Sequence, residues 1–571
     1  MSGIGLILST AKDALQSQQL AINVATQNVA NVNTPDYSRQ IPILEARAPA
    51  PYAGLVLGQG VTVTQIQRQA NTFIENMLQQ RQSDLSATSE KETYMGTLEN
   101  IFSESSDAGL STQMSNFWNA WQDLSNNPSG SAERDTLCQR GELLCQAFSN
   151  ASGEVDQMSS ELNLSLQAGV KTVNDIIKKI ADLNTQIVGF GVTGNANDLM
   201  DQRQNLVNQL SQYLDINYFQ NDDNTMTITT GTGYPLVSHG DSYLLGFEGK
   251  NVTWQSSNGK DLDITSTIKG GKMGGWIDMR DNVIPEYKGK LDDLAGSIIA
   301  AVNGVHSQGV GLEGMTSVTG AYKATDPGSA LQSSGLEYQD QIESGNFSFW
   351  VYDSTGQLVD LGGPNGSLAV SVDPASTTMG NIQSALNGVA GGNITADVTT
   401  DGRLEIQGLN GYSFAFSGDT SNALAALGIN TFFTGTGAGS MAVNSQLEDN
   451  KDLIAAGKVG SSGEIASGDN SNALDMADLQ YQDIAALGDT LGNYLAGMEG
   501  SIGIDSQSVS RSNSYNETMV NNLKQQRDNV SAVSIDEEMT DVIKYQQAYA
   551  AAAKLISIAD QMYQTLLDTK Q

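Results

Sequence analysis

The chain has only two cysteines and two histidines among its 571 residues, which leaves little for disulfide or metal chemistry. Cys138 and Cys145 lie seven residues apart in a helical pattern, so about 10 Å separates their Cα atoms and they cannot form a bridge within that helix. His239 and His306 have no cysteine or carboxylate at metal-ligand spacing. The sequence therefore predicts no zinc site and no internal disulfide, with both cysteines as small buried side chains.

Basic residues and long apolar runs are also scarce. The formal net charge is -35, which argues against binding to nucleic acid or to an anionic membrane surface, because both require clustered lysine and arginine. No stretch approaches 18 apolar residues, and the first 13 residues have no basic region before a hydrophobic one. We therefore expect no membrane insertion and no cleaved signal peptide.

The two ends of the chain carry heptad patterns of apolar residues, typical of helices that pack against other helices. The N-terminal seam is formed by Leu8, Leu15, Ile22 and Val29. The C-terminal seam is formed by Ile535, Val542, Tyr549, Ile556 and Tyr563, flanked by Met539 and Leu567. Such seams predict that the two terminal helices lie side by side as one unit. The alternative is that each docks separately on a core domain.

Between these ends the pattern alternates between helical and strand-like segments. Helices are expected over 61–125, with Phe73 and Trp121 among their core residues, and over 131–187, with seven-residue spacing at Leu166, Val173 and Ile180. The fold class is a multidomain α + β protein, in which the N- and C-terminal parts form a long coiled-coil-like helical rod that carries two β-rich inserts. The expected domains are a terminal helical assembly domain (1–60 with 531–571), a rod (61–216 with 281–312 and 441–530), and β-rich inserts at 217–280 and 313–440.

The segment ANVNTPDYSRQ, residues 30–40, ends the first helix with a turn, in which Asn31 can cap the helix backbone. This string resembles a segment shared by flagellar rod, hook and hook-associated proteins, and its SRQ ending is most similar to the hook-associated protein 1 family. Residues 534–568, the helix around VIPEYKGKLDDLAGS, and GDNSNAL at 468–474 resemble other landmarks of that family. The family usually has glycine where this chain has Asp36, which tolerates the left-handed region, and its members rarely contain cysteine.

The resemblance implies a structural, non-enzymatic subunit of the extracellular bacterial flagellum at the hook–filament junction. Such a protein is exported by the flagellar type III apparatus and assembles into a ring with copies of itself. The implied partners are the hook protein, hook-associated protein 3 and an export chaperone on the C-terminal helix. The assembly residues would be the two seams together with Asn31, Thr34, Pro35, Tyr37 and Arg39 of the turn.

Signs of catalysis or cofactor binding are weak. GFGVTG at 189–194 matches a dinucleotide-binding string, but it ends a helix instead of joining a strand to a helix. The acidic pairs Asp222-Asp223, Asp292-Asp293 and Glu537-Glu538 are adjacent on the chain, and solvated faces explain them better than acid–base pairs. We assign no catalytic, cofactor-binding or metal-binding residue.

Other functions stay open at this point. Within the structural class, the rivals are hook-associated protein 3, flagellin and a hook subunit, although the SRQ motif and the two inserts argue against them. A secreted enzyme, for example a peptidoglycan hydrolase, would place its catalytic carboxylates in 217–280 or 313–440. The same inserts could instead be adhesin-like binding domains.

Overall fold

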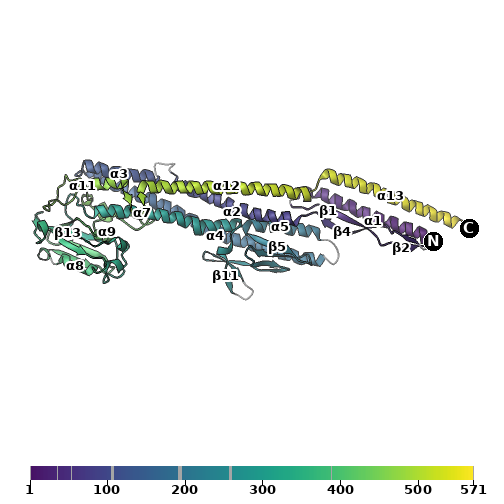
Figure 1. The fold of residues 1–571 in the computed structure, drawn as a ribbon, viewed down its shortest axis with the longest axis horizontal. Helices are drawn as coiled ribbons and strands as arrows, with labels where there is room; N and C mark the ends of the chain where they lie inside the picture. Colours follow the sequence, from purple (N-terminus) through teal and green to yellow (C-terminus); the bar gives the residue numbers. More distant parts are fainter. Residues whose placement is uncertain are drawn as a thin grey trace. The chain divides into compact units, whose positions relative to one another are not determined.

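Figure 1 shows the fold in a computed structural model. The structure describes residues 2–34, 36–52, 55–103, 109–190, 196–255, 260–387 and 389–569. The chain divides into two compact units. The first unit comprises Met1–Tyr94, Glu161–Asp281 and Gln507–Gln571, and the second comprises Met95–Ser160 and Asn282–Ser506.

Long helices dominate the first unit, and three of them, α2, α4 and α12, contribute residues to both units. Its helices are α1 (Ser2–Ala30), α2 (Thr72–Phe102), α4 (Ser131–Phe190), α5 (Asn197–Tyr213), α6 (Gly271–Asp278), α12 (Leu491–Ser531) and α13 (Ile535–Asp568). Its strands are β1 (Gln40–Ala46), β2 (Ala50–Tyr52), β3 (Leu55–Leu57), β4 (Val61–Arg68), β5 (Ile216–Gln220), β6 (Met226–Thr230), β7 (Pro235–Ser238), β8 (Asp241–Ser242), β9 (Leu245–Glu248), β10 (Asn251–Gln255) and β11 (Asp261–Asp263).

The second unit combines helices with small antiparallel sheets. Its further helices are α3 (Leu110–Asn126), α7 (Ile284–His306), α8 (Met379–Asn387), α9 (Ala423–Leu427), α10 (Ser445–Asp449) and α11 (Ser471–Asp478). Its strands are β12 (Ser317–Thr319), β13 (Gly345–Tyr352), β14 (Leu358–Val359), β15 (Leu368–Val372), β16 (Ile394–Val398), β17 (Leu404–Gly408), β18 (Ser413–Ser417), β19 (Phe433–Thr434), β20 (Ala442–Val443), β21 (Asp483–Ile484) and β22 (Asp489–Thr490).

The predicted fold class is confirmed by the helices at both ends and by the sheets between them. Helix α4 is 60 residues long, and its predicted heptad positions Leu166, Val173 and Ile180 are fully buried. Helices α1 and α13 pack against each other, as the terminal seams predicted (Figure 1). The GFGVTG string reaches into residues 191–195, which lie outside the described residues.

The helix expected from residue 61 is wrong, because Val61–Arg68 forms strand β4. This strand pairs antiparallel with β1, and the register shifts between Ile43 and Leu44. Its sequence, VTVTQIQR, alternates β-branched and polar side chains with a period of two, which suits a half-buried strand and not a helix. Phe73, expected in the core, is 71% exposed, so that interpretation is also wrong.

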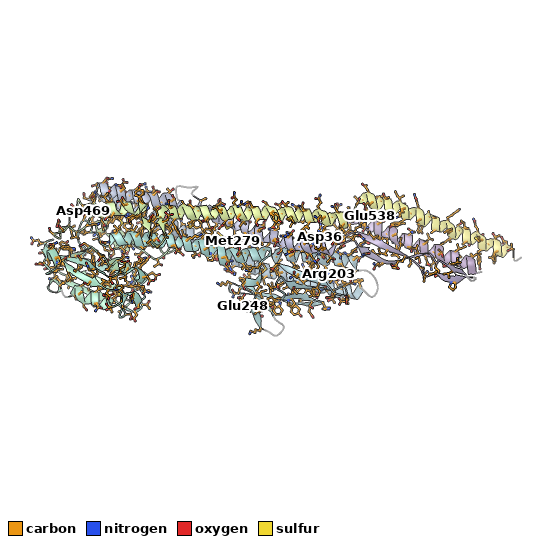
Figure 2. The ribbon with its side chains drawn as sticks, viewed as in Figure 1. Asp36, Arg203, Glu248, Met279, Asp469 and Glu538 are labelled. Atoms are coloured by element: carbon orange, nitrogen blue, oxygen red, sulfur yellow. The ribbon has the colours of Figure 1, made fainter. Side chains whose placement is uncertain are left out.

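Two buried polar residues, Asn184 and Arg203, attach the first β-rich insert to the helices of the first unit. Arg203 is labelled in Figure 2. Asn184 of α4 donates to the carbonyl oxygens of Met226 (2.8 Å) and His239, and accepts from the Met226 amide (3.0 Å). Arg203 of α5 donates to the Asn184 Oδ1 atom at 2.7 Å and to the Asn224 carbonyl at 2.8 Å. The sheet β5-β6-β7-β8 and its loops are therefore joined to both helices by buried hydrogen bonds.

The core of the second unit gathers aromatic side chains from α3 and from the segment before β19. Phe117 and Trp121 lie 5.6 and 5.5 Å from the Phe432 ring, centroid to centroid, and are fully buried. Within the β-rich insert expected at 313–440, strands β13 and β18 pair with each other in one sheet. Most of the buried hydrophobic side chains between Met315 and Ile429 form one cluster, and their burial stabilises the second insert as a folded domain.

Both cysteines are buried and free in α4, as the helical spacing predicted. Burial raises the pKa of Cys138 to about 11 and that of Cys145 to about 12, so both thiols stay protonated at neutral pH. In the described parts of the chain, no helix is both long and apolar enough to cross a membrane.

His306 ends α7 inside the aromatic cluster of the second unit, with no exposed surface. Its Nε2 atom accepts a hydrogen bond from the Ala455 amide at 3.0 Å, so the proton is on Nδ1, which donates to the Asn430 carbonyl at 2.8 Å. Burial lowers the pKa of His306 to about 4. The neutral ring is therefore the folded form, and protonation would break the bond from Ala455.

This histidine should make the chain less stable in mild acid. The unfolded side chain binds a proton near pH 6.5 and the folded one only near pH 4, so stability is lost as the pH falls between these values. We expect the free energy of unfolding to fall by about 2 kcal/mol from this group between pH 7 and pH 5. Urea unfolding followed by tryptophan fluorescence would measure it. His306→Asn should flatten the pH dependence, and the exposed control His239→Asn should not; equal slopes in all three proteins would contradict the assignment.

Candidate functional site

The turn that follows α1 is shaped by its own side chains. The Asn31 amide group donates to the Gln27 carbonyl at 3.0 Å, and the Thr34 hydroxyl donates to Asn31 Oδ1 at 3.1 Å. Asp36 has a φ of 57°, which lies in the left-handed region. Aspartate tolerates this region, as the sequence analysis expects. Pro35 lies outside the described residues. These contacts end the helix and redirect the chain toward β1.

Asn28, near the end of α1, makes the central buried contacts of this region and is only 1% exposed. Its Nδ2 group donates to the Gln40 carbonyl at 2.9 Å and to Glu538 Oε2 at 3.0 Å. Its Oδ1 atom accepts from the Gln40 amide and from the Tyr37 hydroxyl, each at 3.0 Å. The side-chain amide is thereby fully hydrogen-bonded, and it joins α1, the turn, β1 and α13.

Arg39 connects the turn to the first turn of α13. Its Nε group donates to Glu538 Oε1 at 2.6 Å and Nη1 donates to Glu537 Oε2 at 2.9 Å, while Asp541 lies 3.6 Å away. Glu538 is 2% exposed, so the solvated face proposed from the sequence is wrong for this residue. Acidic side chains at a helix N-terminus also interact favourably with the helix dipole.

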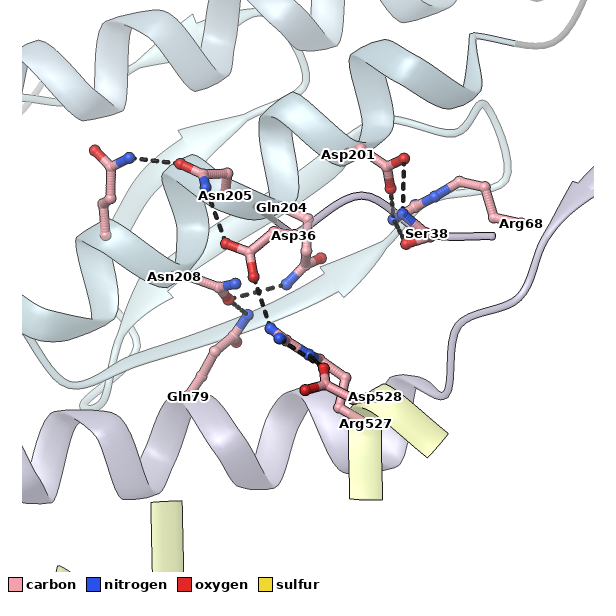
Figure 3. Close-up of polar contacts among 11 residues, drawn as sticks. Asp36, Ser38, Arg68, Gln79, Asp201, Gln204, Asn205, Asn208, Arg527 and Asp528 are labelled. Atoms are coloured by element: carbon pink, nitrogen blue, oxygen red, sulfur yellow. Dashed lines mark hydrogen bonds and ion pairs between the residues drawn. The ribbon is translucent and has the colours of Figure 1, made fainter. Parts of the chain in front are cut away.

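Asp36 links the same turn to α5 and α12 (Figure 3). Its Oδ1 atom accepts from Arg527 Nη1 at 2.6 Å, and Oδ2 accepts from the Asn205 amide group at 2.9 Å. Both contacts are in a partly buried environment, where charged hydrogen bonds are stronger than at an open surface. The Asp36 side chain therefore bridges two helices.

Ser38 and Arg68 meet at a buried carboxylate of α5, Asp201 (Figure 3). Arg68 Nη2 lies 2.6 Å from Asp201 Oδ1, and the Ser38 amide donates to Asp201 Oδ2 at 3.2 Å. Burial raises the pKa of Asp201, and the Arg68 guanidinium opposes that shift. The arrangement fastens the turn and strand β4 to α5.

The pair formed by α1 and α13 buries small residues, which allow close packing of the helices. The buried apolar residues are Ala11, Ala21, Val24 and Ala25 on α1, and Ala552 and Ala559 on α13. Ala552 and Ala559 lie at multiples of seven residues from Glu538. Each of these three residues lies three positions after a residue of the predicted C-terminal seam, namely Ile535, Tyr549 and Ile556. The structure thus buries the neighbouring position of the predicted C-terminal heptad.

The predicted seam residues lie beside this buried line and not at its centre. Leu8, Leu15, Ile22 and Val29 are partly buried, as are Val542 and Ile556. Large apolar side chains along α13 remain 38–54% exposed: Ile535, Met539, Ile543, Tyr549, Leu555, Ile558, Met562, Tyr563, Leu566 and Leu567. At about 100° per residue these side chains point to several sides of α13, and exposed large apolar side chains in this number are typical of a helix that associates with other proteins. We call these ten residues the α13 apolar surface.

No arrangement for catalysis or metal binding stands out among the described residues. They contain no group of three or more His, Cys, Asp or Glu side chains that could hold a metal ion. The acidic pair Asp222-Asp223 is exposed, and Asp223 accepts from Thr225, which lowers its pKa. The contacts described above are therefore structural and concern how chain segments pack together.

Three family models match this chain. The Flagellar hook-associated protein FlgK helical domain matches residues 95–320. The Flagella basal body rod protein model matches 8–37, and the Flagellar basal body rod FlgEFG protein C-terminal model matches 524–569. The last two matches cover α1 with its turn and α13, the elements that pack together at the candidate site.

Whole-length relatives and one solved structure agree with these matches. The flagellar hook-associated protein 1 of Salmonella typhimurium is 25% identical over 99% of this chain and 100% of the relative. Those of Escherichia coli and Bacillus subtilis are 24% and 25% identical, and cover 99% and 98% of this chain and 100% and 97% of the relatives. The flagellar hook junction protein FlgK from Burkholderia pseudomallei has a similar fold, with a TM-score of 0.50 and 17% identity over 80% of this chain and all of that one.

Replacing Arg39 should loosen the start of α13. Arg39→Ala leaves the buried Glu538 carboxylate with only the donor from Asn28, and an uncompensated buried charge costs about 2–4 kcal/mol. We expect amide protection at 538–545 to fall by at least about thirtyfold in hydrogen exchange. Glu538→Gln in the same background should restore part of it.

The matched control is Glu537→Gln, which removes a carboxylate that also contacts Arg39 but is 64% exposed. Exposed ion pairs contribute little, so this variant should change protection less than fivefold, about 1 kcal/mol. Equal effects of Arg39→Ala and Glu537→Gln would show that the buried pair has no special role.

Proposed function

The chain belongs to the flagellar hook-associated protein 1 family, and we propose that it joins hook to filament by assembly of its terminal helices with copies of itself. It is a structural component of the flagellar axis, and its relatives carry names of structural and not of enzymatic proteins. The finer proposal is a ring or tube formed at the hook–filament junction after export through the flagellar type III apparatus. The location is then extracellular.

The α13 apolar surface is the observation that supports assembly most directly. Helix α13 contacts α1 on one side, while its ten large apolar residues keep 38–54% of their surface exposed. Burial of apolar surface contributes about 25 cal/mol per Å², so covering these side chains would strongly favour association. The proposed assembly residues are therefore the C-terminal seam with its neighbours on α13, the N-terminal seam on α1, and the turn.

The partners follow from the same surface and from the family. We propose the hook protein and hook-associated protein 3 as the neighbours on either side of the ring. Before assembly, an export chaperone would cover the exposed apolar residues of α13, since a free surface of this kind favours aggregation. Chaperone and neighbouring subunits would then compete for one surface.

We propose the domain boundaries that the sequence predicts. A terminal assembly domain of 1–60 with 531–571 contains both helices of the α1–α13 pair, and strands β1, β2 and β3 besides. The rod would comprise 61–216 with 281–312 and 441–530, and the inserts 217–280 and 313–440. We propose that neither insert has a catalytic function.

A charge placed on the α13 apolar surface should block assembly without unfolding the chain. Tyr549→Asp adds a carboxylate at a side chain that is 38% exposed in the isolated chain and would be covered in the ring. Burial of that charge should weaken association at least about a hundredfold, a cost of roughly 3 kcal/mol. Incorporation into flagella of cells that lack the wild-type chain would measure the effect.

The control is Gln547→Asp, which adds the same charge to an exposed polar position two residues away on the same helix. Circular dichroism of both purified variants should show the helix content of the wild type. Assembly by Tyr549→Asp at the wild-type level would refute the proposed interface, and unfolding of that variant would show that Tyr549 belongs to the monomer core.

A further inference from the structure

A cavity of about 260 Å³ lies beneath the turn after α1, within the first unit. Its walls come from the turn, the start of α2, α5 and the end of α12, through residues that include Asp36, Glu75, Asn208, Arg527 and Ser531. Asn33, Thr34 and Asp528 at its edge are exposed, so a group can enter from solvent. The cavity is therefore an open polar pocket next to the residues that hold α1 and α13 together.

Two residues of the pocket wall each have a buried polar atom without a hydrogen-bond partner. Glu75 is 8% exposed, and its Oε2 atom is buried without a donor. Ser531 is 6% exposed, and its hydroxyl is likewise buried and unpartnered. Burying a polar group without a partner is unfavourable, most of all for a carboxylate, so the pocket is incomplete in the isolated chain.

Arg527 does not complete it, although it is the one arginine in the wall. Its Nη1 group donates to Asp36 at 2.6 Å, and Nε and Nη2 donate to Asp528 Oδ1 at 3.1 and 2.9 Å. The pocket walls thus hold three carboxylates, Asp36, Glu75 and Asp528, and one guanidinium. That guanidinium, of Arg527, is bonded to Asp36 and Asp528 and not to Glu75 Oε2. A further positive group with N–H donors would match the charge and the free acceptor.

We propose that this pocket binds an ammonium or guanidinium group, supplied during assembly by a lysine or arginine side chain of a neighbouring subunit. The inference rests on the proposed function, because the neighbour is an axial subunit. A metal ion fits less well, because Asp36 and Asp528 already accept hydrogen bonds from Arg527, and no group of three acidic, His or Cys side chains among the described residues could hold a metal ion. A polyatomic cation can instead donate several hydrogen bonds to the acceptors of the pocket, as ammonium carries three N–H donors.

The state of Glu75 in the isolated chain agrees with an empty cation site. Burial raises the pKa of Glu75; Arg527 opposes the shift, and Asp36 adds to it. An acid with a raised folded pKa is less stable ionised, so its contribution to stability falls as the pH rises above its unfolded value of 4.5. Glu75 should therefore destabilise the isolated chain at neutral pH and become favourable only when a cation arrives.

Glu75→Gln gives a test with two opposite signs. The variant keeps the shape and removes the charge, so the isolated chain should melt about 2 °C higher, while incorporation into flagella of cells that lack the wild type falls at least about tenfold. The control Asp222→Asn removes the same charge from an exposed turn of the first unit and should change neither value. A Glu75→Gln chain that is less stable, or that incorporates as well as the control, would overturn the proposal and assign the pocket to ordered water.

A second measurement separates the two sources of the cation. Thermal unfolding of the isolated wild-type chain in n-butylammonium chloride, compared with equal sodium chloride, tests for a free amine. A higher melting temperature for wild type but not for Glu75→Gln would identify a small-molecule cation site. No difference, together with the tenfold loss of incorporation, would identify the side chain of a neighbour, and no difference without that loss would refute cation binding.

Failure of this inference can be told apart from failure of the proposed function. If Tyr549→Asp blocks incorporation and Glu75→Gln does not, assembly through α13 stands and the pocket has no part in it. If neither variant affects incorporation, the proposed assembly through the terminal helices is wrong as well.

Discussion

The buried contact of Glu538 with Arg39 and Asn28 fixes how the two ends of the chain meet. Asn28 and Glu538 are 510 residues apart, yet their side chains are 3.0 Å apart in an environment with almost no solvent. An amide and a carboxylate buried there are stable only when every polar atom has a partner, so one alignment of α1 against α13 satisfies them. A shift of either helix by one turn would leave Glu538 buried and unpaired.

That constraint matters because the apolar part of the helix pair does not define its register. The buried apolar residues of the two helices are mostly alanines, whose small side chains allow close packing but resemble one another along each helix. Alanine contacts can re-form after a shift with little loss, whereas a buried ion pair cannot. In this structure the polar contacts set the alignment, and small apolar residues allow the helices to approach.

Much of the helical architecture could be predicted from the sequence, because helix periodicity is a local property. The heptads at 8–29 and at 166–187 marked helices that the structure contains, and Asp36 occupies the left-handed region that its residue type tolerates. Strand β4 was missed because its period-two pattern lies within a segment read as helix. The burial of Glu538 could not be predicted from the sequence, because its partners are distant along the chain. Its neighbours Asp536 and Glu537 are also acidic but exposed, so the local sequence does not single out Glu538.

The same reasoning explains why the seam residues and the buried residues differ. A heptad column identifies a stripe of large apolar side chains, but it does not say which partner covers the stripe. Within one chain, Ala552 and Ala559 of α13 are buried, whereas the side chains of Tyr549, Tyr563 and Leu567 remain 38–54% exposed. One helix face can thus provide two contacts: a close one inside the subunit through small residues, and a larger one through residues that a single chain cannot bury. In the proposed assembly, neighbouring subunits would cover these exposed side chains, so association would stabilise the folded chain by mass action.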